Sequence, residues 1–359
     1  MSRPLRICLV ASSRFPVLEP FAGGLEALTH GLARELVHRG HEVSLFAAPG
    51  SDPRLPVTEL PVPTFTPSAQ ARTDVGTIPA QWMAEHHAYL GLMLDLGRDG
   101  HQRFDVVHNN SLHHLPVAMA RSLTVPMVTT VHTPPLAWLE SAAILADGAA
   151  TFTAVSAHTA RAWAHVVDCE VVMNGVDTTT WRSGHGGGPA VWSGRMVPEK
   201  APQVALDAAA LAGVPIVLAG PVPDRPYFDA EIAPRLGPAA RYAGHLDHRA
   251  LARLLGAAGV AVVTPDWDEP YGLVASEALA CGTPVAAVAR GALPEIVDDT
   301  VGALAAPGDL AGLADAIRRA RGRSRAAARE RAVRRFSVEQ MVDGYERIYQ
   351  RALDQPVAA

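Results

Sequence analysis

The sequence is poor in cysteine and in charged residues. Three cysteines, Cys8, Cys169 and Cys281, occur in 359 residues, and they are too widely spaced to form a disulfide framework. This usage is typical of a reducing compartment, so we expect a cytoplasmic protein. Charged residues make up 19% of the chain and the formal net charge is −5, which argues against nucleic acid as the main partner.

The chain also lacks a long hydrophobic run. No stretch of roughly 18 continuous apolar residues is present, so we expect no transmembrane segment. The N-terminus leads directly into a strand-like run over residues 5–10, without the pattern of a signal peptide. Hydrophobic residues nevertheless make up 48% of the sequence, which is typical of a well-packed globular protein. At this length the chain can form two domains of ordinary size.

Strand-like and helix-like segments alternate along the first half of the chain. The apolar patterns predict strands over 6–11, 42–47, 105–108, 126–131 and 151–155, and helices over 25–39 and 81–96. Such alternation favours a doubly wound parallel sheet that is covered by helices.

A glycine-rich segment over residues 183–189 interrupts this alternation and has the composition of a flexible linker. The alternation then resumes, with strands predicted over 191–194, 215–219, 241–243, 260–265 and 284–289 and helices over 201–211, 249–258 and 273–280. The α/β pattern therefore predicts two Rossmann-like doubly wound domains, which we place at residues 1–182 and 183–336, followed by a C-terminal segment over 337–359.

Two glutamates flank the predicted start of one helix in the second domain. Glu269 follows an apolar strand, and Glu277 lies one to two turns into the helix. The first backbone amides of a helix have no partner within it and form a ready anion site. Carboxylates beside an anion site suit a ligand with a central phosphate and hydroxyl groups on both sides, such as a nucleotide sugar. The alternative is a pair of solvated carboxylates at a helix terminus.

Two basic residues form a second candidate site. Arg195 and Lys200 follow the predicted strand 191–194, five positions apart, just before a helix. Fixed cations at this place can stabilise the negative charge that develops on a departing diphosphate. A pair of surface cations is the alternative interpretation. We interpret Glu199, which lies between them, as a structural residue.

The segment from Glu269 to Val285 resembles the signature of the retaining glycosyltransferases of family 4, in which seven residues separate two glutamates. Other matching pieces follow in the family's order over nearly the whole chain. The resemblance implies the two-domain B-type glycosyltransferase (GT-B) fold, with residues 337–359 crossing back onto the first domain. It also implies a nucleotide-sugar donor held mainly by the second domain, an acceptor that enters from the first, and hexose transfer with retention of configuration.

The resemblance assigns roles to individual residues. Arg195 and Lys200 match positions that hold the donor diphosphate, and Glu277 matches the glutamate that accepts hydrogen bonds from the ribose. Glu269 and His132 match positions that face the transferred sugar. Further donor contacts are expected from Gly23, Gly24, Gly244, His245, Tyr271, Gly272, Leu273 and Val274. A plain turn at Gly23–Gly24 and a satisfied buried histidine at position 132 are the corresponding alternatives.

Three histidines, His108, His113 and His114, invite a metal interpretation, but neighbours such as His113 and His114 cannot point the same way on a regular element. The resemblance implies no metal and no other cofactor. UDP-glucose is the expected donor, because residues 219–221, 227–228 and 242–244 resemble glucosyltransferases that act on small molecules such as pterins. The expected acceptor is the hydroxyl group of a small molecule or a glycan.

Two other functions and one further segment complete the set of hypotheses. A nucleotide-sugar epimerase of the same fold would need acid/base carboxylates around the sugar, and a nucleotide-sugar sensor would have lost catalysis. The joint presence of Arg195, Lys200, Glu269 and Glu277 disfavours the sensor. The arginine-rich residues 318–335 predict a solvated helix face, with binding of anionic lipid or nucleic acid as the alternative.

Overall fold

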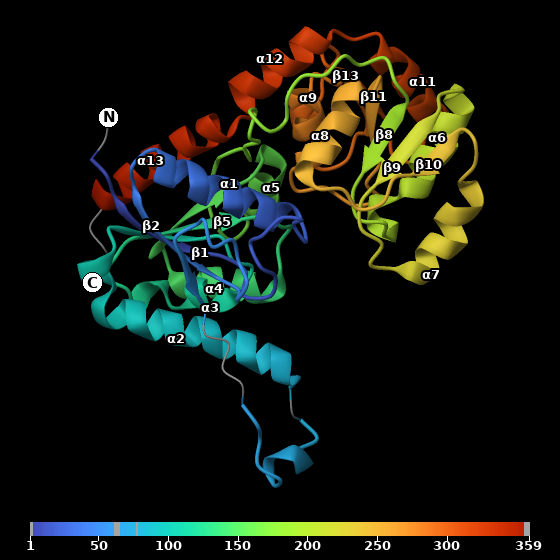
Figure 1. Cartoon of the computed structure of the whole chain (residues 1–359). Helices are drawn as coiled ribbons and strands as arrows, with labels where there is room; N and C mark the ends of the chain where they lie inside the picture. The colour runs from blue at the N-terminus through green and yellow to red at the C-terminus, as the bar shows by residue number, and fades with distance from the viewer. Residues whose placement is uncertain (1–2, 61–64, 77, 355–359) are drawn as a thin grey trace. The chain divides into compact units, whose positions relative to one another are not determined.

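The computed structural model describes residues 3–60, 65–76 and 78–354, and the chain divides into two compact units. The first unit comprises the chain up to Val155, Ala160–Val172 and the chain from Val342 onward. The second comprises Ser156–Thr159 and Met173–Met341. Figure 1 labels many of the helices and strands of both units. Residues 1–2 of the predicted first domain and 355–359 of the predicted C-terminal segment lie outside the described residues.

The first unit is built on a parallel sheet in the order β3-β2-β1-β4-β5-β6-β7. Its strands are β1 (Arg6–Val10), β2 (Glu42–Ala47), β3 (Val57–Glu59), β4 (Val106–Asn109), β5 (Met127–Val131), β6 (Ala150–Ala154) and β7 (Cys169–Val171). The strand order reverses between β1 and β4. Because ligands of open α/β sheets bind at the carboxyl ends of the strands beside such a reversal, this edge is a candidate ligand site.

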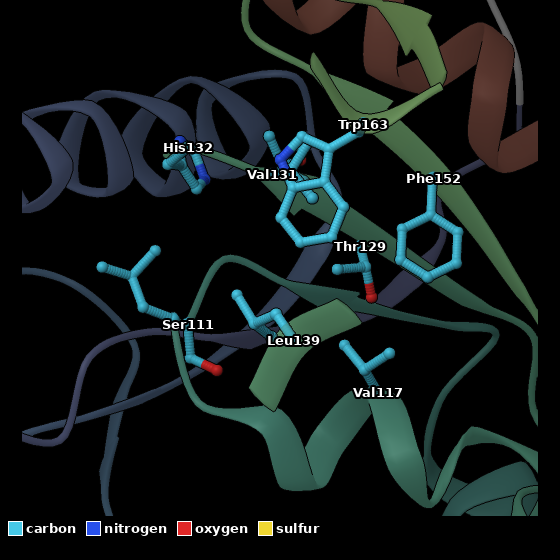
Figure 2. Close-up of a pocket in the computed structure, with 10 residues that line it drawn as sticks. Ser111, Val117, Thr129, Val131, His132, Leu139, Phe152 and Trp163 are labelled. Carbon is cyan, nitrogen blue, oxygen red and sulfur yellow. The ribbon is translucent and has the colours of Figure 1, made fainter. Parts of the chain in front are cut away.

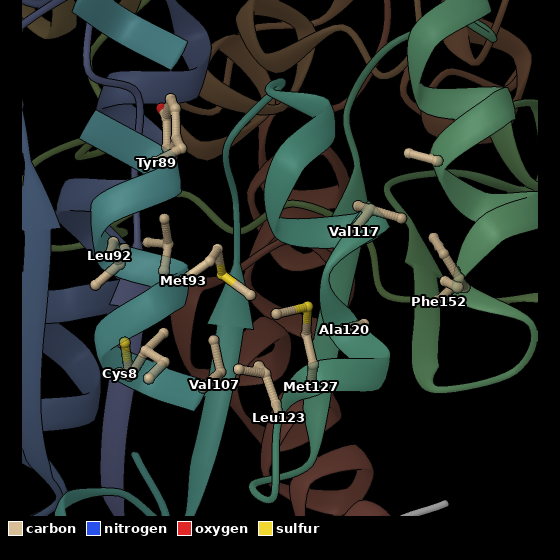
Figure 3. Close-up of a cluster of buried hydrophobic side chains, with 14 of the residues drawn as sticks. Cys8, Tyr89, Leu92, Met93, Val107, Val117, Ala120, Leu123, Met127 and Phe152 are labelled. Atoms are coloured by element: carbon tan, nitrogen blue, oxygen red, sulfur yellow. The ribbon is translucent and has the colours of Figure 1, made fainter. Parts of the chain in front are cut away.

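Helices pack on the sheet of the first unit through alternating strand residues. Its helices are α1 (Gly24–His38), α2 (Ala80–Arg103), α3 (His114–Ala118), α4 (Ala137–Ala146), the second part of α5 (Ala157–Trp163) and most of α13 (Val338–Asp354). Val107 of β4 and Cys8 of β1 share a buried core with Leu92 and Met93 of α2, as Figure 3 shows. Buried apolar side chains therefore fix α2 against the sheet.

The opposite side of β4 carries a buried polar network. The two ring nitrogens of His108 pair with the hydroxyl groups of Tyr349, at 2.6 Å, and Thr130, at 2.8 Å. Burial lowers the pKa of His108 to about 3, so its imidazole is neutral. His108 thus joins β4 and β5 to α13 as a satisfied core histidine.

The second unit repeats the arrangement with the strand order β10-β9-β8-β11-β12-β13, again parallel throughout. Its strands are β8 (Ala190–Ser193), β9 (Ile216–Ala219), β10 (Ala240–Tyr242), β11 (Val260–Val263), β12 (Val285–Val288) and β13 (Gly302–Ala305). The order reverses between β8 and β11. The prediction of two Rossmann-like doubly wound domains is confirmed.

Helices cover the second sheet in two groups. The main helices are α6 (Pro202–Ala212), α8 (His248–Ala257), α9 (Leu273–Ala280), α11 (Leu310–Arg321) and α12 (Arg325–Arg335); shorter ones are α7 (Arg225–Tyr227) and α10 (Leu293–Ile296). Small side chains of α6 and α11 fill one core with Trp192 and Val262 of the sheet. Helix α9 packs on β11 and β12 and contacts both α8 and α12. This packing places the start of α9 beside the end of β11.

The prediction of a flexible linker over residues 183–189 is wrong. Backbone amides of Gly184, Gly186 and Gly188 donate hydrogen bonds to carbonyls of Cys281, Gly256 and Ala257, respectively. A Cβ atom on Gly184 would lie 2.3 Å from a backbone atom of Gly256. The glycines therefore serve close backbone packing and not flexibility.

The arginine-rich segment is also more than a solvated face. The guanidinium of Arg329 donates to the carbonyl oxygens of Thr178, Trp181 and Ala280 at 2.6–2.9 Å. Arg325 likewise donates to Gly256, Ala258 and Cys281 at 2.9–3.0 Å. Both arginines satisfy carbonyl groups at helix and loop ends, which corrects the prediction of a purely solvated surface. Within the residues described, no helix is long and apolar enough to cross a membrane.

Candidate functional site

The predicted cationic residues and the predicted glutamate all follow strands at the strand reversal of the second unit. Arg195 and Lys200 lie in the segment that follows β8, and Glu269 lies in the loop that follows β11. These two strands are neighbours and run parallel. Their carboxyl ends therefore bring residues 69 positions apart in the sequence into one group.

Lys200 and Glu269 form the closest contact of this group. The Lys200 Nζ atom lies 2.5 Å from Glu269 Oε2, and both side chains are partly buried. The indole Nε1–H of Trp267 donates to the same carboxylate oxygen at 3.1 Å. The ring of Trp267 also faces Lys200, with Nζ 5.1 Å from the ring centroid. Trp267 thus contacts both members of the ion pair and fixes their orientation.

The loop that carries Glu269 is held from several sides. The Glu269 carbonyl accepts a hydrogen bond from the amide of Ala292 at 2.8 Å. At Gly291, where φ is +57°, a Cβ atom would lie 2.1 Å from the Glu269 carbonyl oxygen. Ser156 and Thr159 donate their hydroxyl protons to the carbonyl of Pro270, at 2.6 and 3.0 Å. The carboxylate is therefore presented by a backbone with little freedom to move.

Helix α9 begins directly after this loop. Gly272 precedes the first helical residue with φ +100°, and a Cβ atom there would lie 2.7 Å from Leu293 Cδ2. Glycine is required at this position for both reasons. The amides of Leu273 and Val274 belong to the first turn, where backbone N–H groups have no partner inside the helix. The start of α9 is therefore a candidate anion site beside Lys200 and Glu269.

Glu277 lies on the same helix and is buried. Its side chain is 6% exposed and makes no hydrogen bond or ion pair with any residue that the structure describes. Burial raises the pKa of Glu277 to about 8. A carboxylate is costly to bury without a partner. Hydrogen-bond donors supplied by a ligand would therefore stabilise the charged form of Glu277. The alternative of a solvated carboxylate is wrong for Glu277.

The other predicted residues of the second unit have different environments. Tyr271 is 4% exposed, and its hydroxyl donates to the carbonyl of Asn174 at 2.6 Å and accepts from Ser276 at 3.1 Å. Its side chain is thus a structural anchor, in contrast to the expected donor contact, and its backbone amide is the group left for a ligand. Gly244 and the exposed His245 follow β10, in a loop whose Gly244 carbonyl accepts from the amide of Gly220.

Arg195 is the most accessible of the predicted catalytic residues. Its side chain is 47% exposed and its Nη2 atom lies 3.4 Å from Glu199 Oε1, a weak surface ion pair. The Glu199 carbonyl accepts a hydrogen bond from the amide of Asp266 at 2.9 Å. Glu199 therefore links the segment after β8 to the segment after β11, while the Arg195 guanidinium keeps most of its donors for a ligand.

In the first unit, His132 follows β5 and pairs with Asn110, which follows β4. Its Nε2 atom lies 2.7 Å from Asn110 Oδ1. Because a carbonyl oxygen only accepts, Nε2 carries the proton and Nδ1 is left as an acceptor. Burial lowers the pKa of His132 to about 3, so the ring is neutral. The imidazole is consequently suited to accept a hydrogen bond from a sugar hydroxyl.

A small pocket adjoins His132, and Figure 2 shows its lining. The walls include apolar side chains of Val117, Leu139 and Trp163. It is about the size of one water molecule. The Thr129 Oγ1 atom in its wall is buried and has no hydrogen-bond partner in the described chain. The pocket is thus fit for a bound water and not for a sugar.

Gly23 and Gly24 stand at the start of α1, as predicted. Gly23 precedes the helix in an extended conformation, and Gly24 is its first residue. The helix start could present backbone amides to an anion. Within the first unit, this pair and His132 both follow strands at the carboxyl edge of the parallel sheet.

Sequence reasoning missed two residues with clear contacts in these sites, Trp267 and Asn110. Trp267 lies two positions before Glu269, so its place in the loop was a usable signal, but its contact with Lys200 spans the chain from α6 to β11. Asn110 was visible as the residue after a strand end. Among the residues that the structure describes, no group of three or more His, Cys, Asp or Glu side chains is arranged to hold a metal ion.

Comparison with known proteins agrees with this geometry. The family model described as Glycosyltransferase Family 4 matches residues 22–180, and the model described as Glycosyl transferases group 1 matches residues 188–333. The D-inositol 3-phosphate glycosyltransferase of Mycobacterium bovis is 32% identical over 98% of this chain and 84% of its own length. The glycogen synthase of Mycobacterium tuberculosis is 30% identical over 88% of this chain and 85% of its own length.

A solved structure supports the same assignment. AviGT4, a glycosyltransferase involved in avilamycin A biosynthesis, superposes with a TM-score of 0.71 at 25% identity and covers 98% of both chains. Fold and sequence thus define a GT-B glycosyltransferase. The chain belongs to the glycosyltransferases of family 4, and it is a hexosyltransferase.

Proposed function

We propose that this enzyme transfers glucose from UDP-glucose to a hydroxyl group of a small molecule or a glycan, with retention of configuration and without a metal ion. The observation that carries the donor site is Glu277, a buried carboxylate with no partner in the described chain, beside the start of α9. Two ribose hydroxyl groups would supply the hydrogen-bond donors that this carboxylate lacks. A glucosyl donor is in keeping with the match to a protein named glycogen synthase.

In this proposal the cations after β8 and the start of α9 stabilise the departing diphosphate. Arg195 offers a mostly unpaired guanidinium fork, and Lys200 offers an ammonium group held by Glu269 and Trp267. As the bond to the sugar breaks, negative charge grows on the phosphate, and preorganised cations favour that state over the ground state. The departing phosphate oxygen would take the acceptor's proton on the same face, which gives retention. Within the second unit, Glu269 would orient the sugar hydroxyl groups.

The resemblance to small-molecule glucosyltransferases, including those that act on pterins, stays part of this proposal. Sugar transfer is the function that the family assignment supports, so the sensor and the epimerase are secondary. The epimerase would release a changed nucleotide sugar without any acceptor, which distinguishes it from transfer.

The decisive test is a calorimetric and thermal-shift comparison of UDP, GDP, ADP and TDP, each alone and with its common sugars. A ligand that binds the folded state raises its apparent stability, so one nucleotide should stand out. Binding of UDP and UDP-glucose, lost in Glu277→Ala, is the expected result. Selective binding of another nucleotide would refute UDP as the base, and no binding at all would refute the donor site.

A further inference from the structure

Six ring side chains of the first unit form a cluster that the assignment above does not use. The aromatic–histidine cluster consists of Trp82, His86, Tyr89, His113, His114 and Trp138. Trp82 stacks on His86 at 5.1 Å with an interplanar angle of 17°, and His113 stacks on His114 at 4.4 Å and 24°. Trp138 joins the two stacks, with centroids 5.1 Å from Trp82 and 4.5 Å from His114.

The cluster lies at the carboxyl edge of the sheet, at its strand reversal. His113 and His114 follow β4, Trp138 follows β5, and the remaining rings belong to the first half of α2. The Tyr89 hydroxyl accepts from the amide of Ser13 and donates to the carbonyl of Ala11, each at 2.9 Å, which ties α2 to the end of β1. The cluster therefore occupies the position where open α/β sheets bind ligands.

The cluster is partly open and electrically neutral. Trp138 is 52% exposed, although tryptophan is among the largest apolar side chains. Burial is the main cause that lowers the pKa of His86, His113 and His114, that of His113 to about 3. The carboxylate of Glu85, whose charge acts on His113, is neutralised by a two-pronged contact with Arg14 at 3.0 and 3.1 Å. The surface thus offers ring faces without a net charge.

One buried polar atom of the cluster has no hydrogen-bond partner among the described residues. His86 Nδ1 is buried, and no hydrogen bond to it occurs within the described residues. A buried polar atom without a partner is costly, and a ligand hydroxyl group can remove that cost. The cluster therefore combines apolar ring faces with an unsatisfied hydrogen-bonding group.

We propose that the aromatic–histidine cluster is the acceptor site and that it binds a neutral sugar ring, which makes the acceptor a glycan or a glycoside. This inference rests on the proposed transferase function. The face of a pyranose carries several C–H groups with slight positive charge, which are attracted to the negative face of an aromatic ring. Its edge carries hydroxyl groups, which suit the neutral imidazoles. Arg14 and Glu85 beside the cluster pair with each other, so an ionic acceptor would have to compete with this pair.

The test uses saturation-transfer NMR with the full chain and a panel of neutral gluco-, galacto- and manno-oligosaccharides, with p-nitrophenol as the aromatic probe. We expect at least one oligosaccharide to bind, and Trp138→Ala to weaken it roughly tenfold, as for the loss of one good ring contact. Trp138→Phe, which keeps a ring, should recover most of the affinity. Leu211→Ala removes an equally exposed apolar side chain, 52%, from the second unit and should have no effect.

Calorimetric titration of UDP into the same proteins separates the two hypotheses. UDP binding that is unchanged in Trp138→Ala shows that the donor site is intact. If the wild-type protein binds UDP but no oligosaccharide, or binds p-nitrophenol alone, the acceptor inference is refuted while the donor site stands. If oligosaccharide affinity is the same in wild type and Trp138→Ala, the cluster is not the site. Failure of UDP to bind would instead refute the proposed function.

Discussion

Replacing the carboxylate of Glu277 by an amide should stabilise the free enzyme and abolish its affinity for the donor. Glu277→Gln keeps the size and shape of the side chain and removes the titrating group. The carboxyl group is buried without a partner in the described chain, and its pKa rises from 4.5 to about 8. The folded state therefore holds a proton that the unfolded state releases over this range.

The sign and size of the effect follow from linkage. A raised carboxyl pKa lowers stability as pH increases from about 4.5 to about 8, and the full penalty is present above that range. Since tenfold in an acid constant equals about 1.4 kcal/mol, the penalty is on the order of 5 kcal/mol above pH 8. Near pH 5 it falls to about 1 kcal/mol. Glu277→Gln removes this dependence.

The assay is thermal unfolding of both proteins between pH 5 and pH 9 without ligand. A domain of this size changes its Tm by about 2–4 °C per kcal/mol. The melting temperature of Glu277→Gln, relative to wild type, should therefore rise by roughly 10 °C from pH 5 to pH 8.5 and then level off. Calorimetry with UDP, the proposed nucleotide, should show binding by the wild type and little or none by the variant.

Parallel melting curves would refute this reasoning. If the difference in Tm between the two proteins were the same at pH 5 and pH 8.5, Glu277 would not titrate over this range in the folded state. Equal nucleotide affinity in both proteins would remove the ribose role. A matched control is Glu330→Gln, which changes the same residue type on α12, where the side chain is 67% exposed, and should leave the pH dependence of Tm unaltered.

The remaining predictions concern catalysis, metal dependence and stability. Arg195→Ala or Lys200→Ala should lower kcat by about 100-fold or more with an unchanged Tm, and near-wild-type turnover would exclude the diphosphate role. Trp267→Phe, which keeps the ring but loses the N–H donor to Glu269, should lower kcat more than it raises KM for the donor; a change in Tm alone would mean a structural role. EDTA should leave activity intact, and a loss that one divalent ion restores would overturn the metal-free proposal. Arg329→Met should lower the free energy of unfolding by about 2–4 kcal/mol, measured by urea titration, because carbonyls of Thr178 and two other residues lose their donor.

The sheet framework was predictable because parallel strands are buried on both faces and appear as short apolar runs. Val260–Val263 and Val285–Val288 are such runs, and each became a central strand. The segment over residues 225–235 was not predicted as helical, since it passes from α7 through a π-helical turn to a 3-10 turn and has no sustained period. The glycines over 183–189 misled the prediction, because composition alone does not distinguish flexibility from close backbone packing.

Site residues that stand directly after a predicted strand could be predicted from the sequence. Features of the site that depend on contacts between distant segments could not. Arg195, Lys200 and Glu269 stand directly after strands, so the fold class alone brings them to one edge. The unpartnered state of Glu277 depends on everything packed around α9, which no local pattern encodes. The rings of the aromatic–histidine cluster come from α2, the start of α3 and α4. In the sequence, the neighbouring residues His113 and His114 served only as an argument against a metal site.

Neither predicted carboxylate of the proposed donor site carries an unpaired charge when no donor is bound. Glu269 is neutralised by Lys200, and Glu277 holds a proton at neutral pH, because its pKa is about 8. A diphosphate that attracts Lys200 weakens the ion pair between Lys200 and Glu269. Ribose hydroxyl groups that donate to Glu277 favour the charged form of this carboxyl group over the protonated form. Donor binding should therefore release a proton below about pH 8 and convert a closed ion pair into groups that face the sugar. The charged form of Glu277 would then be populated mainly when a donor is bound, so donor binding and the charge state of this site would be linked.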